Sequence, residues 1–466
     1  MELSIQELLN ATGGKLLFPT KERIIRRISI DSRVIPEDAL FVPVIGEKSD
    51  GHLYLPNAVN AGAKAVLSSS AEAAEALEGT EAAVILVSDT VGALQAVGKA
   101  ARSKLRIPAV GVTGSVGKTT TREMVFRALS GGLKAYKTEK NYNNRLGVPL
   151  TLSEIPNDAE IAVLELGMNV PGELGTISAL TDIDTAVITN VGTAHMEYYG
   201  TREGIAKEKF TVTKGFSPEN PREKRLFLNG DDPFLSRYPE YTTYPVTTYG
   251  FGEGNDYSAG NLRSVNAQYV FDLVRKGEPV LTVTLSALGE HNVLNALAAL
   301  AVADHYGVDL KKAAEALSRF TGFKGRLERI ECRGALLIDD SYNASPASMK
   351  VGLKVLSELE FGTGRKIAVL GDMLELGPES DKLHYRVGQD GANEDVQEFL
   401  LVGARAKWIA RGLKEYGSNA VIRCFPDRES VLKYLEDSFT PGNVYYFKAS
   451  HGMEFSKLTE ALIHHE

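Results

Sequence analysis

Residues 111–120 read "GVTGSVGKTT" and lie between an apolar run that is typical of a strand and the helix-like run "KTTTREMVFRALS". Glycines let such a turn fold tightly and point backbone N–H groups at an anion, and the following helix directs its positive end at the same place. Lys118 would neutralise phosphate charge, and Thr119 would offer a hydroxyl to magnesium. The stretch therefore predicts a nucleotide-phosphate loop, with the candidate contacts Gly114, Ser115, Val116, Gly117, Lys118, Thr119 and Thr120.

This loop departs from the strict phosphate-loop pattern, which has a glycine five positions before Gly117. Val112 occupies that position. We interpret Val112 as the end of the preceding strand, so that the loop is shorter than usual. The alternative is an ordinary strand–turn–helix corner with a chance Gly-Lys-Thr. The strand before the turn and the helix after it favour the phosphate loop.

The composition is that of a globular protein without a general affinity for nucleic acid. A chain of 466 residues suggests about three domains. Hydrophobic residues make up 43% and charged residues 24%, and the net charge of −8 is opposite to that of a basic nucleic-acid-binding face. The only cysteines are Cys332 and Cys424, which excludes a disulfide framework and zinc-type spacing and favours a reducing compartment.

The chain carries no sign of secretion or membrane insertion. Its start, "MELSIQELLN", has neither a basic segment nor an apolar core, so we expect no signal peptide. Every apolar run is shorter than the roughly 18 residues that a membrane-spanning helix needs. We expect a cytoplasmic protein, and we take it to be a monomer.

Apolar, β-branched runs alternate with helix-like segments, which predicts an α/β fold with parallel sheets. The runs that we expect to be strands include 62–70, 82–89, 160–166 and 184–191. Residues 220–285 differ, with turns such as "NGDDP" and "GEGND" between short strands. After residue 327 the alternation resumes with about five strand-like runs, a second α/β unit of the Rossmann type. We place domain boundaries near residues 106 and 327, which gives a mixed α/β domain (1–106), a parallel-sheet phosphate-loop domain (107–327) and a Rossmann-like domain (328–466).

Two polar residues follow predicted strands of the middle domain and are candidate metal ligands. Glu165 ends the strand 160–166, and His195 comes soon after the strand 184–191. Open parallel sheets bind ligands at the carboxyl ends of their strands, where both side chains would join the phosphate loop. Either residue alone is equally compatible with a surface charge or a satisfied core polar group.

With these residues considered together, the chain resembles the Mur ligase family of bacterial cell-wall synthesis. The family's phosphate loop departs from the strict pattern in the same way. Further segments resemble the family in the expected order: "EKNYNNRLGVPLTL" (139–152), "ELGMNVPGEL", "NVGTAHMEYYGTREGIAKEKF", "GEHNVLNALAA", "GRLE" and "DDSYNASPASM". The run "LGDMLELG" is typical of the family member that adds D-alanyl-D-alanine.

The resemblance implies an ATP-dependent amide ligase that joins D-alanyl-D-alanine to UDP-N-acetylmuramoyl-tripeptide through an acyl phosphate. ATP, Mg²⁺ and these two substrates are the implied ligands. The implied sites are the first domain for the uridine nucleotide, the middle domain for ATP and the last domain for the dipeptide.

Three alternatives remain. One is a Mur ligase that adds another amino acid, although the Asp-Asn-Pro-Arg signature usual in the preceding, diaminopimelate- or lysine-adding ligase does not occur here. A second is a folyl-polyglutamate synthetase, which lacks the uridine-binding domain. A third, from another class, is a regulatory phosphate-loop NTPase.

The resemblance also implies roles around the metal ions. Lys118 and Thr119 hold the phosphates and one Mg²⁺, which Glu165 also binds, and His195 is a ligand of a second Mg²⁺. A carbamylated lysine downstream of the histidine supports that second metal in the family. Lys207 and Lys209 both compete for this role, and the family spacing favours Lys209. Because residues two apart point to different sides of a helix, Lys207 fits a solvated face.

Further roles are implied for nucleotide and substrate contacts. Asn292 and Asn295 resemble adenine-side contacts, Arg326 resembles the γ-phosphate contact, and Asp340 a ribose or hinge contact. The candidate substrate-binding residues are Ser32 and Arg33 for the uridine nucleotide, and Asn141, Asn143, Asn144, Tyr342, Asn343, Ser345, Ser450 and His451 elsewhere.

One departure from the family affects the dipeptide site. The family usually has a Gly-Ser-Arg-like run near the C-terminus, whereas this chain has "KASHGMEF", with His451 in the place of arginine. Arginine binds a carboxylate through two hydrogen bonds and is always charged, and histidine has neither property. The group that holds the dipeptide carboxylate therefore stays open. Our hypothesis is that the backbone and hydroxyl of Ala449-Ser450 hold it.

Overall fold

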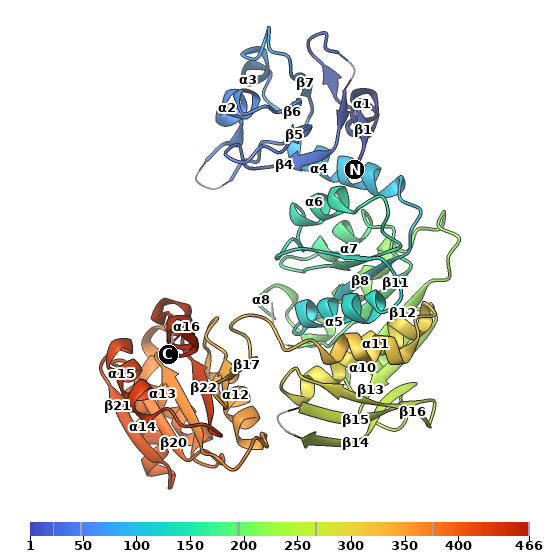
Figure 1. Ribbon diagram of the computed structural model, residues 1–466. Coiled ribbons are helices and arrows are strands. Elements are labelled where there is room, and N and C mark those ends of the chain that lie inside the picture. Colours follow the sequence, from blue (N-terminus) through green and yellow to red (C-terminus); the bar gives the residue numbers. More distant parts are fainter. Residues whose placement is uncertain (22, 47–48, 193–195, 266–267, 375, 465–466) are drawn as a thin grey trace. The chain divides into compact units, whose positions relative to one another are not determined.

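A computed structural model of the chain describes residues 1–21, 23–46, 49–192, 196–265, 268–374 and 376–464 (Figure 1). The chain divides into two compact units. The first comprises Met1–Ser258 and Asn295–Ala313, and the second comprises Ala259–Leu294 and Ala314–Glu466. The N-terminal sheet and the phosphate loop belong to the first unit, and the C-terminal sheet belongs to the second.

Five described strands form the N-terminal sheet in the order β2-β7-β6-β5-β4. Neighbouring strands from β4 to β7 are parallel, and β2 is antiparallel to β7. The strands are β2 (Lys15–Leu16), β4 (Arg27–Ser29), β5 (Ala39–Phe41), β6 (Ala65–Ser68) and β7 (Ala83–Leu86), and a separate pair joins β1 (Leu3–Ser4) to β3 (Ile24–Ile25). The strands predicted at 62–70 and 82–89 are confirmed as β6 and β7.

Helices cover both faces of this sheet. They are α1 (Ile5–Thr12), α2 (Leu55–Asn60), α3 (Ala71–Glu75) and α4 (Thr90–Ser103). Buried residues of α1 and α4 share one core with Leu40 and Ile85, and those of α2 and α3 share another with Phe41. The carboxylate of Asp89 accepts backbone N–H groups at the start of α4, which is why this long helix begins there.

Nine described strands form the central sheet in the order β16-β15-β14-β13-β12-β11-β8-β10-β9. They are β8 (Ala109–Thr113), β9 (Ala135–Lys137), β10 (Ile161–Glu165), β11 (Thr185–Ile188), β12 (Arg225–Asn229), β13 (Val246–Gly250), β14 (Tyr257–Val265), β15 (Gln268–Arg275) and β16 (Glu278–Leu285). β8 pairs in parallel with β10 on one side and β11 on the other. The chain therefore changes direction around β8, which is where open α/β sheets bind ligands.

Residues 220–285 depart from the predicted series of short strands, because β14, β15 and β16 are eight or nine residues long. β15 and β16 are antiparallel, with an irregularity between Leu273 and Val274. Burial alternates along β15, as in a sheet with one exposed face. The polar residues on that exposed face interrupt the apolar runs, so the sequence did not predict strands of this length.

Helices of the central region follow the strands. They are α5 (Lys118–Ser130), α6 (Gly147–Glu154), α7 (Glu173–Ser178), α8 (Met196–Tyr199), α9 (Arg202–Phe210), α10 (Glu290–His305) and α11 (Leu310–Ser318). α5 begins directly at Lys118 and buries Met124, Val125, Ala128 and Leu129. The helix predicted after the phosphate loop is therefore confirmed.

Six described strands form the C-terminal sheet in the order β17-β18-β22-β19-β20-β21. They are β17 (Glu328–Cys332), β18 (Ala335–Asp339), β19 (Lys366–Gly371), β20 (Glu398–Val402), β21 (Val421–Phe425) and β22 (Val444–Lys448). The five predicted strands are parallel, as in a Rossmann-like sheet. β17 is an additional antiparallel strand, joined to β18 through Arg333 and Gly334, which both have positive φ. The sequence reading missed it because "RG" is a weaker hairpin signal than Asn-Gly or Asp-Gly.

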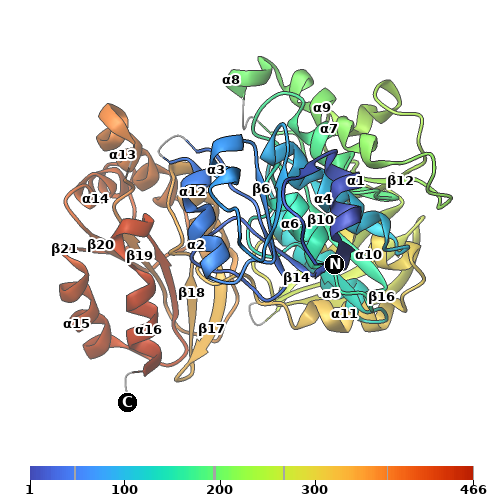
Figure 2. The ribbon, with the colours of Figure 1, turned by 90° about the horizontal axis from the view of Figure 1, so that it is seen from above.

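Helices cover both faces of the C-terminal sheet (Figure 2). Buried residues of α12 (Pro346–Glu358), α13 (Ser380–Gly391) and α14 (Ala406–Glu415) share one core with Ile338 and Leu370. Buried residues of α15 (Arg428–Ser438) and α16 (Ser456–His464) share the opposite core with Leu337 and Val369.

The predicted fold class, α/β with parallel sheets, is confirmed. The boundaries near residues 106 and 327 stay a prediction. Within the described residues, every helix is too short or too polar to cross a membrane.

Arg102 ties the end of α4 to the central sheet. Its side chain is 1% exposed, and the guanidinium donates hydrogen bonds to the carbonyl oxygens of Thr181 at 2.8 Å and Asp182 at 3.0 Å. It also donates to the carbonyls of Leu105 and Ile107 in the segment that follows α4. A buried cation is stable only with such a full set of partners.

We expect Arg102→Met to lower the free energy of unfolding by about 3 kcal/mol, because four carbonyl groups lose their donor. Urea titration followed by circular dichroism measures the loss. The control Arg106→Met changes an exposed side chain and should alter the free energy by less than about 0.5 kcal/mol. An unchanged midpoint for Arg102→Met would contradict the role of Arg102.

Candidate active site

The phosphate loop lies at the carboxyl end of β8, and two of its glycines are required by its shape. Gly117 has φ 84°, a left-handed conformation that favours glycine. At Gly114, an added Cβ would lie 1.9 Å from the Thr189 hydroxyl. Val112 is part of β8, as expected, and the loop proper begins at Gly114.

Side chains that follow β11 hold the loop in place. The amide of Asn190 accepts the Val116 N–H at 3.0 Å and donates to the Val116 carbonyl at 2.9 Å. The Thr189 hydroxyl donates to the same carbonyl, and the Ser115 hydroxyl accepts the Gly192 N–H. Sequence reasoning missed Thr189 and Asn190. Their position, just after a strand next to β8, was the available signal.

Lys118 is the first residue of α5, and its side chain folds over the loop. Its Nζ donates to the Gly114 carbonyl at 2.9 Å and makes a longer contact of 3.4 Å with the Ser115 carbonyl. Burial lowers the pKa of Lys118, opposed by the nearby Glu165. A phosphate in the loop would replace these carbonyl contacts with stronger, charge-assisted hydrogen bonds.

Glu165 lies at the end of β10, paired in register with Val112, and is 2% exposed. Its Oε1 accepts hydrogen bonds from the Thr119 hydroxyl at 3.2 Å and from the Asn143 amide at 2.8 Å. Its Oε2 is buried and accepts no hydrogen bond from the described residues. The end of β10 and the start of α5 therefore bring together the Glu165 carboxylate and the Thr119 hydroxyl, which were predicted to bind one Mg²⁺.

These groups fit a magnesium ion of the kind that phosphates share with the protein. Among the described residues, no cluster of three or more His, Cys, Asp and Glu side chains could hold a metal alone. Mg²⁺ in phosphate-binding sites usually takes one or two carboxylates and completes its shell with phosphate oxygens and water. The Oε2 of Glu165, which accepts no hydrogen bond from the described residues, and the hydroxyl of Thr119 suit that arrangement. His195, the candidate for a second metal, lies outside the described residues.

Arg122 forms an ion pair with Glu165, and sequence reasoning missed this residue. It is 4% exposed, with Nη1 at 3.4 Å from Glu165 Oε2 and a hydrogen bond to the Lys140 carbonyl at 3.2 Å. Arg122 and Glu123 are adjacent on α5 and both buried, which is unusual for charged residues and becomes visible only in the folded structure.

Lys209 and Lys207 differ as the helical geometry predicted. Lys209 is 1% exposed, whereas Lys207 is exposed to solvent. Burial, together with the positive charge of Lys118, lowers the pKa of Lys209 to about 7. The effect of Lys118 indicates that the Lys209 amine lies near the phosphate loop. Its carbamylation stays a prediction.

The two candidate adenine contacts are already hydrogen-bonded. Asn295 accepts a hydrogen bond from the Thr121 hydroxyl at 2.9 Å, and its side chain lies against Gly117 of the phosphate loop. Asn292 donates to the Leu288 carbonyl at 2.7 Å within its own helical turn. Their role in binding adenine stays a prediction.

A cavity of about 960 Å³ in the N-terminal part is lined by both uridine-site candidates, Ser32 and Arg33. Arg33 forms an ion pair of 2.8 Å with Asp31, and this contact lowers the pKa of Asp31 to about 2. Tyr142, which sequence reasoning missed, also lines the cavity. It comes from the predicted substrate-contacting segment.

Two other candidates in the segment 139–152 differ in their exposure and hydrogen bonding. Asn141 is exposed. The side-chain oxygen of Asn144 accepts the N–H groups of Leu146 and Gly147 at the start of α6, and its contact with substrate stays a prediction.

In the second unit, Arg326, Tyr342 and His451 lie close together. The Arg326 guanidinium stacks at 4.2 Å over the Tyr342 ring, and the Tyr342 and His451 rings are 6.2 Å apart. Tyr342 is 54% exposed, so this face can meet a ligand. Ser450, next to His451, is buried and its hydroxyl accepts the Leu374 N–H at 2.8 Å.

Asp340 is engaged on both carboxylate oxygens. One oxygen accepts the Leu327 N–H at 3.2 Å, and the other accepts the Tyr446 hydroxyl at 2.9 Å and the ammonium of Lys448. Burial raises the pKa of Asp340. Leu327 has φ 50°, so Asp340 holds a strained turn just after Arg326. This geometry favours the predicted hinge role over a free ribose contact.

Two further candidates of the last domain have local roles. The Asn343 side chain accepts the N–H of Ala344. Ser345 caps α12 through reciprocal hydrogen bonds with Ser348. Such caps form from neighbouring residues and need no ligand.

Three family models match the chain in sequence order. "Mur ligase family, catalytic domain" matches residues 24–102, "Mur ligase middle domain" matches 112–303, and "Mur ligase, glutamate ligase domain" matches 325–451. A Bacillus subtilis (strain 168) protein named UDP-N-acetylmuramoyl-tripeptide–D-alanyl-D-alanine ligase is 35% identical over 99% of this chain and 98% of its own length. The chain belongs to the Mur ligase family. This Mur ligase is accordingly an enzyme that forms carbon–nitrogen bonds.

Solved structures resemble this Mur ligase over nearly its whole length. MurF from Acinetobacter baumannii is 30% identical, with a TM-score of 0.85 and coverage of 99% of both chains. MurF from Thermotoga maritima, solved in complex with ADP, is 29% identical, with a TM-score of 0.75 and coverage of 94% and 97%. The predicted three-part α/β architecture is confirmed.

We expect Lys209 to react with carbon dioxide at a pH where other lysines do not. Only a neutral amine forms a carbamate, and a pKa of about 7 leaves half of the Lys209 amines neutral at pH 7. An ordinary lysine, with a pKa near 10.4, is less than about 0.1% neutral there. ¹³C NMR with labelled bicarbonate should show a carbamate signal that grows between pH 6 and 8.

The matched variants separate the two lysines of this Mur ligase. Lys209→Arg should abolish the carbamate signal, and Lys207→Arg should keep it. A signal that survives Lys209→Arg unchanged would reject the assignment.

Proposed function

We propose that this Mur ligase joins the amine of D-alanyl-D-alanine to the terminal carboxylate of UDP-N-acetylmuramoyl-tripeptide, using ATP. The observation that carries the proposal is the 35% identity, over 99% of the chain, to a ligase of that name. The braced phosphate loop at the centre of the parallel sheet supports the use of a nucleotide. The reaction completes the UDP-muramoyl-pentapeptide precursor of peptidoglycan.

The first step activates the peptide carboxylate, which is a poor electrophile by itself. A carboxylate oxygen attacks the γ-phosphorus of ATP, ADP leaves, and an acyl phosphate forms. Phosphoryl transfer asks the protein mainly for positioning and charge neutralisation. Lys118 and the N–H groups of residues 114–119 would supply both, because they surround the place where the phosphates fit.

Magnesium would be held by Thr119 and Glu165, and when bound it neutralises charge on the phosphate oxygens. His195 and a carbamylated Lys209 are proposed for a second magnesium ion. A carbamate suits this place because it turns a buried cation, repelled by Lys118, into an anion.

The second step forms the amide bond. The dipeptide amine attacks the acyl carbon, the C–O bond to phosphate breaks, and inorganic phosphate leaves with the bonding electrons. The amine must lose a proton, because only its lone pair can attack. We propose that the dipeptide binds at the exposed face that Tyr342 and His451 share. In the same unit, we propose that Arg326 contacts the nucleotide and that Asp340 has the hinge role.

The ligands proposed for this enzyme are ATP, Mg²⁺ and the two small substrates. We propose that it acts in the cytoplasm, where the nucleotide-linked precursor is made. We also propose that it is a monomer and binds no nucleic acid.

The decisive assay measures phosphate release and amide formation together. We expect both only when ATP, the UDP-linked tripeptide and D-alanyl-D-alanine are all present, and little product with L-lysine or diaminopimelate as the amine. Lys118→Ala should lower the rate at least about a hundredfold, because the charge facing the phosphates is lost in the transition state. Phosphate release from ATP alone would instead support a regulatory NTPase, and preference for another amino acid would support a different Mur ligase.

The role of His451 is tested by His451→Ala. If backbone and hydroxyl groups near Ser450 hold the dipeptide carboxylate, the KM for D-alanyl-D-alanine should rise only a few-fold, with kcat unchanged. Steady-state kinetics over a range of dipeptide concentrations measures both constants. A hundredfold loss in kcat/KM would show that His451 has taken over the usual role of arginine.

A further inference from the structure

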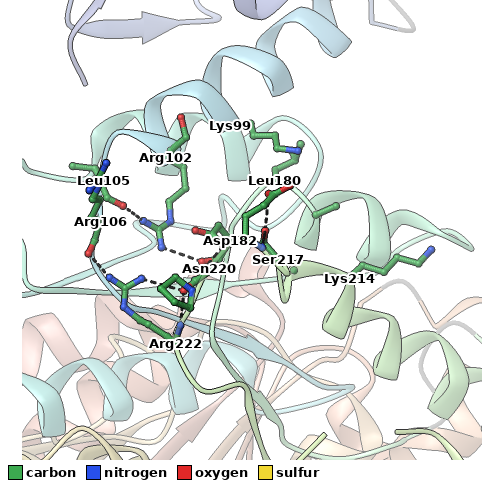
Figure 3. A pocket seen from close by; sticks show the side chains of 15 residues that line it. Lys99, Arg102, Leu105, Arg106, Leu180, Asp182, Lys214, Ser217, Asn220 and Arg222 are labelled. Carbon is green, nitrogen blue, oxygen red and sulfur yellow. Dashed lines mark hydrogen bonds between the residues drawn. The ribbon is translucent and has the colours of Figure 1, made fainter. Parts of the chain in front are cut away.

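A second cavity, of about 590 Å³, lies in the first unit far from the phosphate loop (Figure 3). The end of α4 and the segment after it form one wall, and residues after α7 and around 214–222 form the other. Arg106 in this cavity precedes β8 by three residues, whereas the phosphate loop follows β8. The two sites are therefore at opposite edges of the central sheet, separated by the length of β8, about 13 Å or more.

The cavity is strongly basic in a chain that is acidic as a whole. Five cationic side chains line it, and only two carboxylates, those of Asp182 and Glu219, oppose them. The cationic residues are Lys99, Arg102, Arg106, Lys214 and Arg222. Because the whole chain carries −8, this concentration of positive charge is local.

Two of the arginines form a fixed frame. All the hydrogen bonds of Arg102 go to backbone carbonyls, as described above. Arg222 donates to the Arg106 carbonyl and to the side chain of Asn220, whose amide donates to Asp182 at 3.1 Å. Figure 3 shows the bonds from Arg222 to Arg106 and from Arg102 to Asp182 joining the two walls. The cavity is therefore shaped before any ligand arrives, which lowers the cost of binding.

The remaining three cations, Lys99, Arg106 and Lys214, have exposed side chains. Among the described residues, none of these side chains forms a hydrogen bond or an ion pair. Burial lowers the pKa of Arg102 and of the neighbouring Lys224, and in both cases the charge of Arg222 adds to the effect. At Arg102 the carboxylates of Asp182 and Asp184 oppose these effects on the pKa. The three exposed cations of the cavity have no such partner among the described residues, and an anion between them would supply one.

We propose that this cavity binds a compact phosphate-bearing anion of about the size of pyrophosphate. Guanidinium groups pair with phosphate oxygens through two hydrogen bonds, and the lysines add point charges. Ser103 and Ser217 also line the cavity, but their hydroxyls already donate to the Ala100 carbonyl and to Glu219. No described aromatic residue lines the cavity, so it offers no surface on which a nucleobase could stack.

Such a ligand would bridge two parts of the first unit. Lys99 belongs to α4, which packs on the N-terminal sheet, and Lys214 belongs to the 3-10 helix Thr211–Gly215 beside the central sheet. An anion held by both would stabilise that junction in proportion to its concentration. This binding goes beyond the ligase reaction, because it uses none of the residues proposed for catalysis.

The test is isothermal titration calorimetry with sodium pyrophosphate, in EDTA and about 50 mM salt. The protein is the full chain carrying Lys118→Ala, so that the phosphate loop does not compete. We expect one site per chain, and a dissociation constant at least tenfold weaker after adding Lys99→Ala and Arg106→Ala. The matched control adds Lys134→Ala and Lys311→Ala, which remove two exposed lysines elsewhere and should leave binding unchanged.

Each outcome decides the proposal. Binding that resists the two cavity substitutions, or that the control pair weakens equally, overturns the site. Citrate binding as tightly as pyrophosphate overturns the phosphate assignment. Thermal unfolding without ligand should show that the cavity variant is as stable as its parent, since both replaced side chains are exposed. With Lys118 restored, the cavity variant should keep its ligation rate, which separates this site from the catalytic one.

Discussion

The contact between Gly114 and Thr189 sets the geometry on which the active site depends. There is no space for a side chain at residue 114, because the Thr189 hydroxyl occupies it and binds the Val116 carbonyl. Asn190 then holds both polar groups of the Val116 backbone. The phosphate loop is thus shaped by the neighbouring strand as well as by its own glycines. A loop held in this way presents its N–H groups without reorganising, and such preorganisation is the main source of electrostatic catalysis.

Buried charge is the second theme of the site. Glu165, Arg122 and Lys209 are buried around the loop and Lys118 is half-buried, and each buried charge would be costly alone. Glu165 and Arg122 offset part of this cost by pairing, whereas Lys209 loses part of its affinity for a proton. The same low-dielectric surroundings that lower the pKa of Lys209 would strengthen its attraction to a metal once it carried a carbamate.

The central sheet uses its two edges differently. At the carboxyl ends of β8, β10 and β11, short loops offer N–H groups, a carboxylate and a hydroxyl to phosphates and a metal. At the amino ends, Arg102 and Arg222 tie the segment after α4 to the sheet and leave a basic cavity beside it. Both edges attract anions, but only the first carries groups that can take part in phosphoryl transfer.

The sequence by itself determined the elements whose causes are local. Apolar runs, glycines and the helix that starts at Lys118 were enough to predict the parallel sheets, the phosphate loop and a carboxylate at the end of β10. Family resemblance added the roles of residues. Its spacing favoured Lys209 over Lys207, and helical periodicity indicated that the two side chains point to different sides of the helix. Asn144 and Ser345, candidate substrate contacts implied by the resemblance, also have local roles, because Asn144 accepts N–H groups at the start of α6 and Ser345 caps α12. Their contacts with substrate stay predictions.

The tertiary structure decided what depends on residues far apart in the chain. Asn190 reaches Val116 across 74 positions, Glu165 reaches Thr119 across 46, and Lys448 reaches Asp340 across 108. Burial, which is the main cause of the lowered pKa of Lys209 and which places Glu165 Oε2 beside Arg122, also comes from packing. A local sequence pattern predicts neither these contacts between distant residues nor the desolvation of a buried side chain. Both arise only when separate segments pack together and exclude water from the space between them.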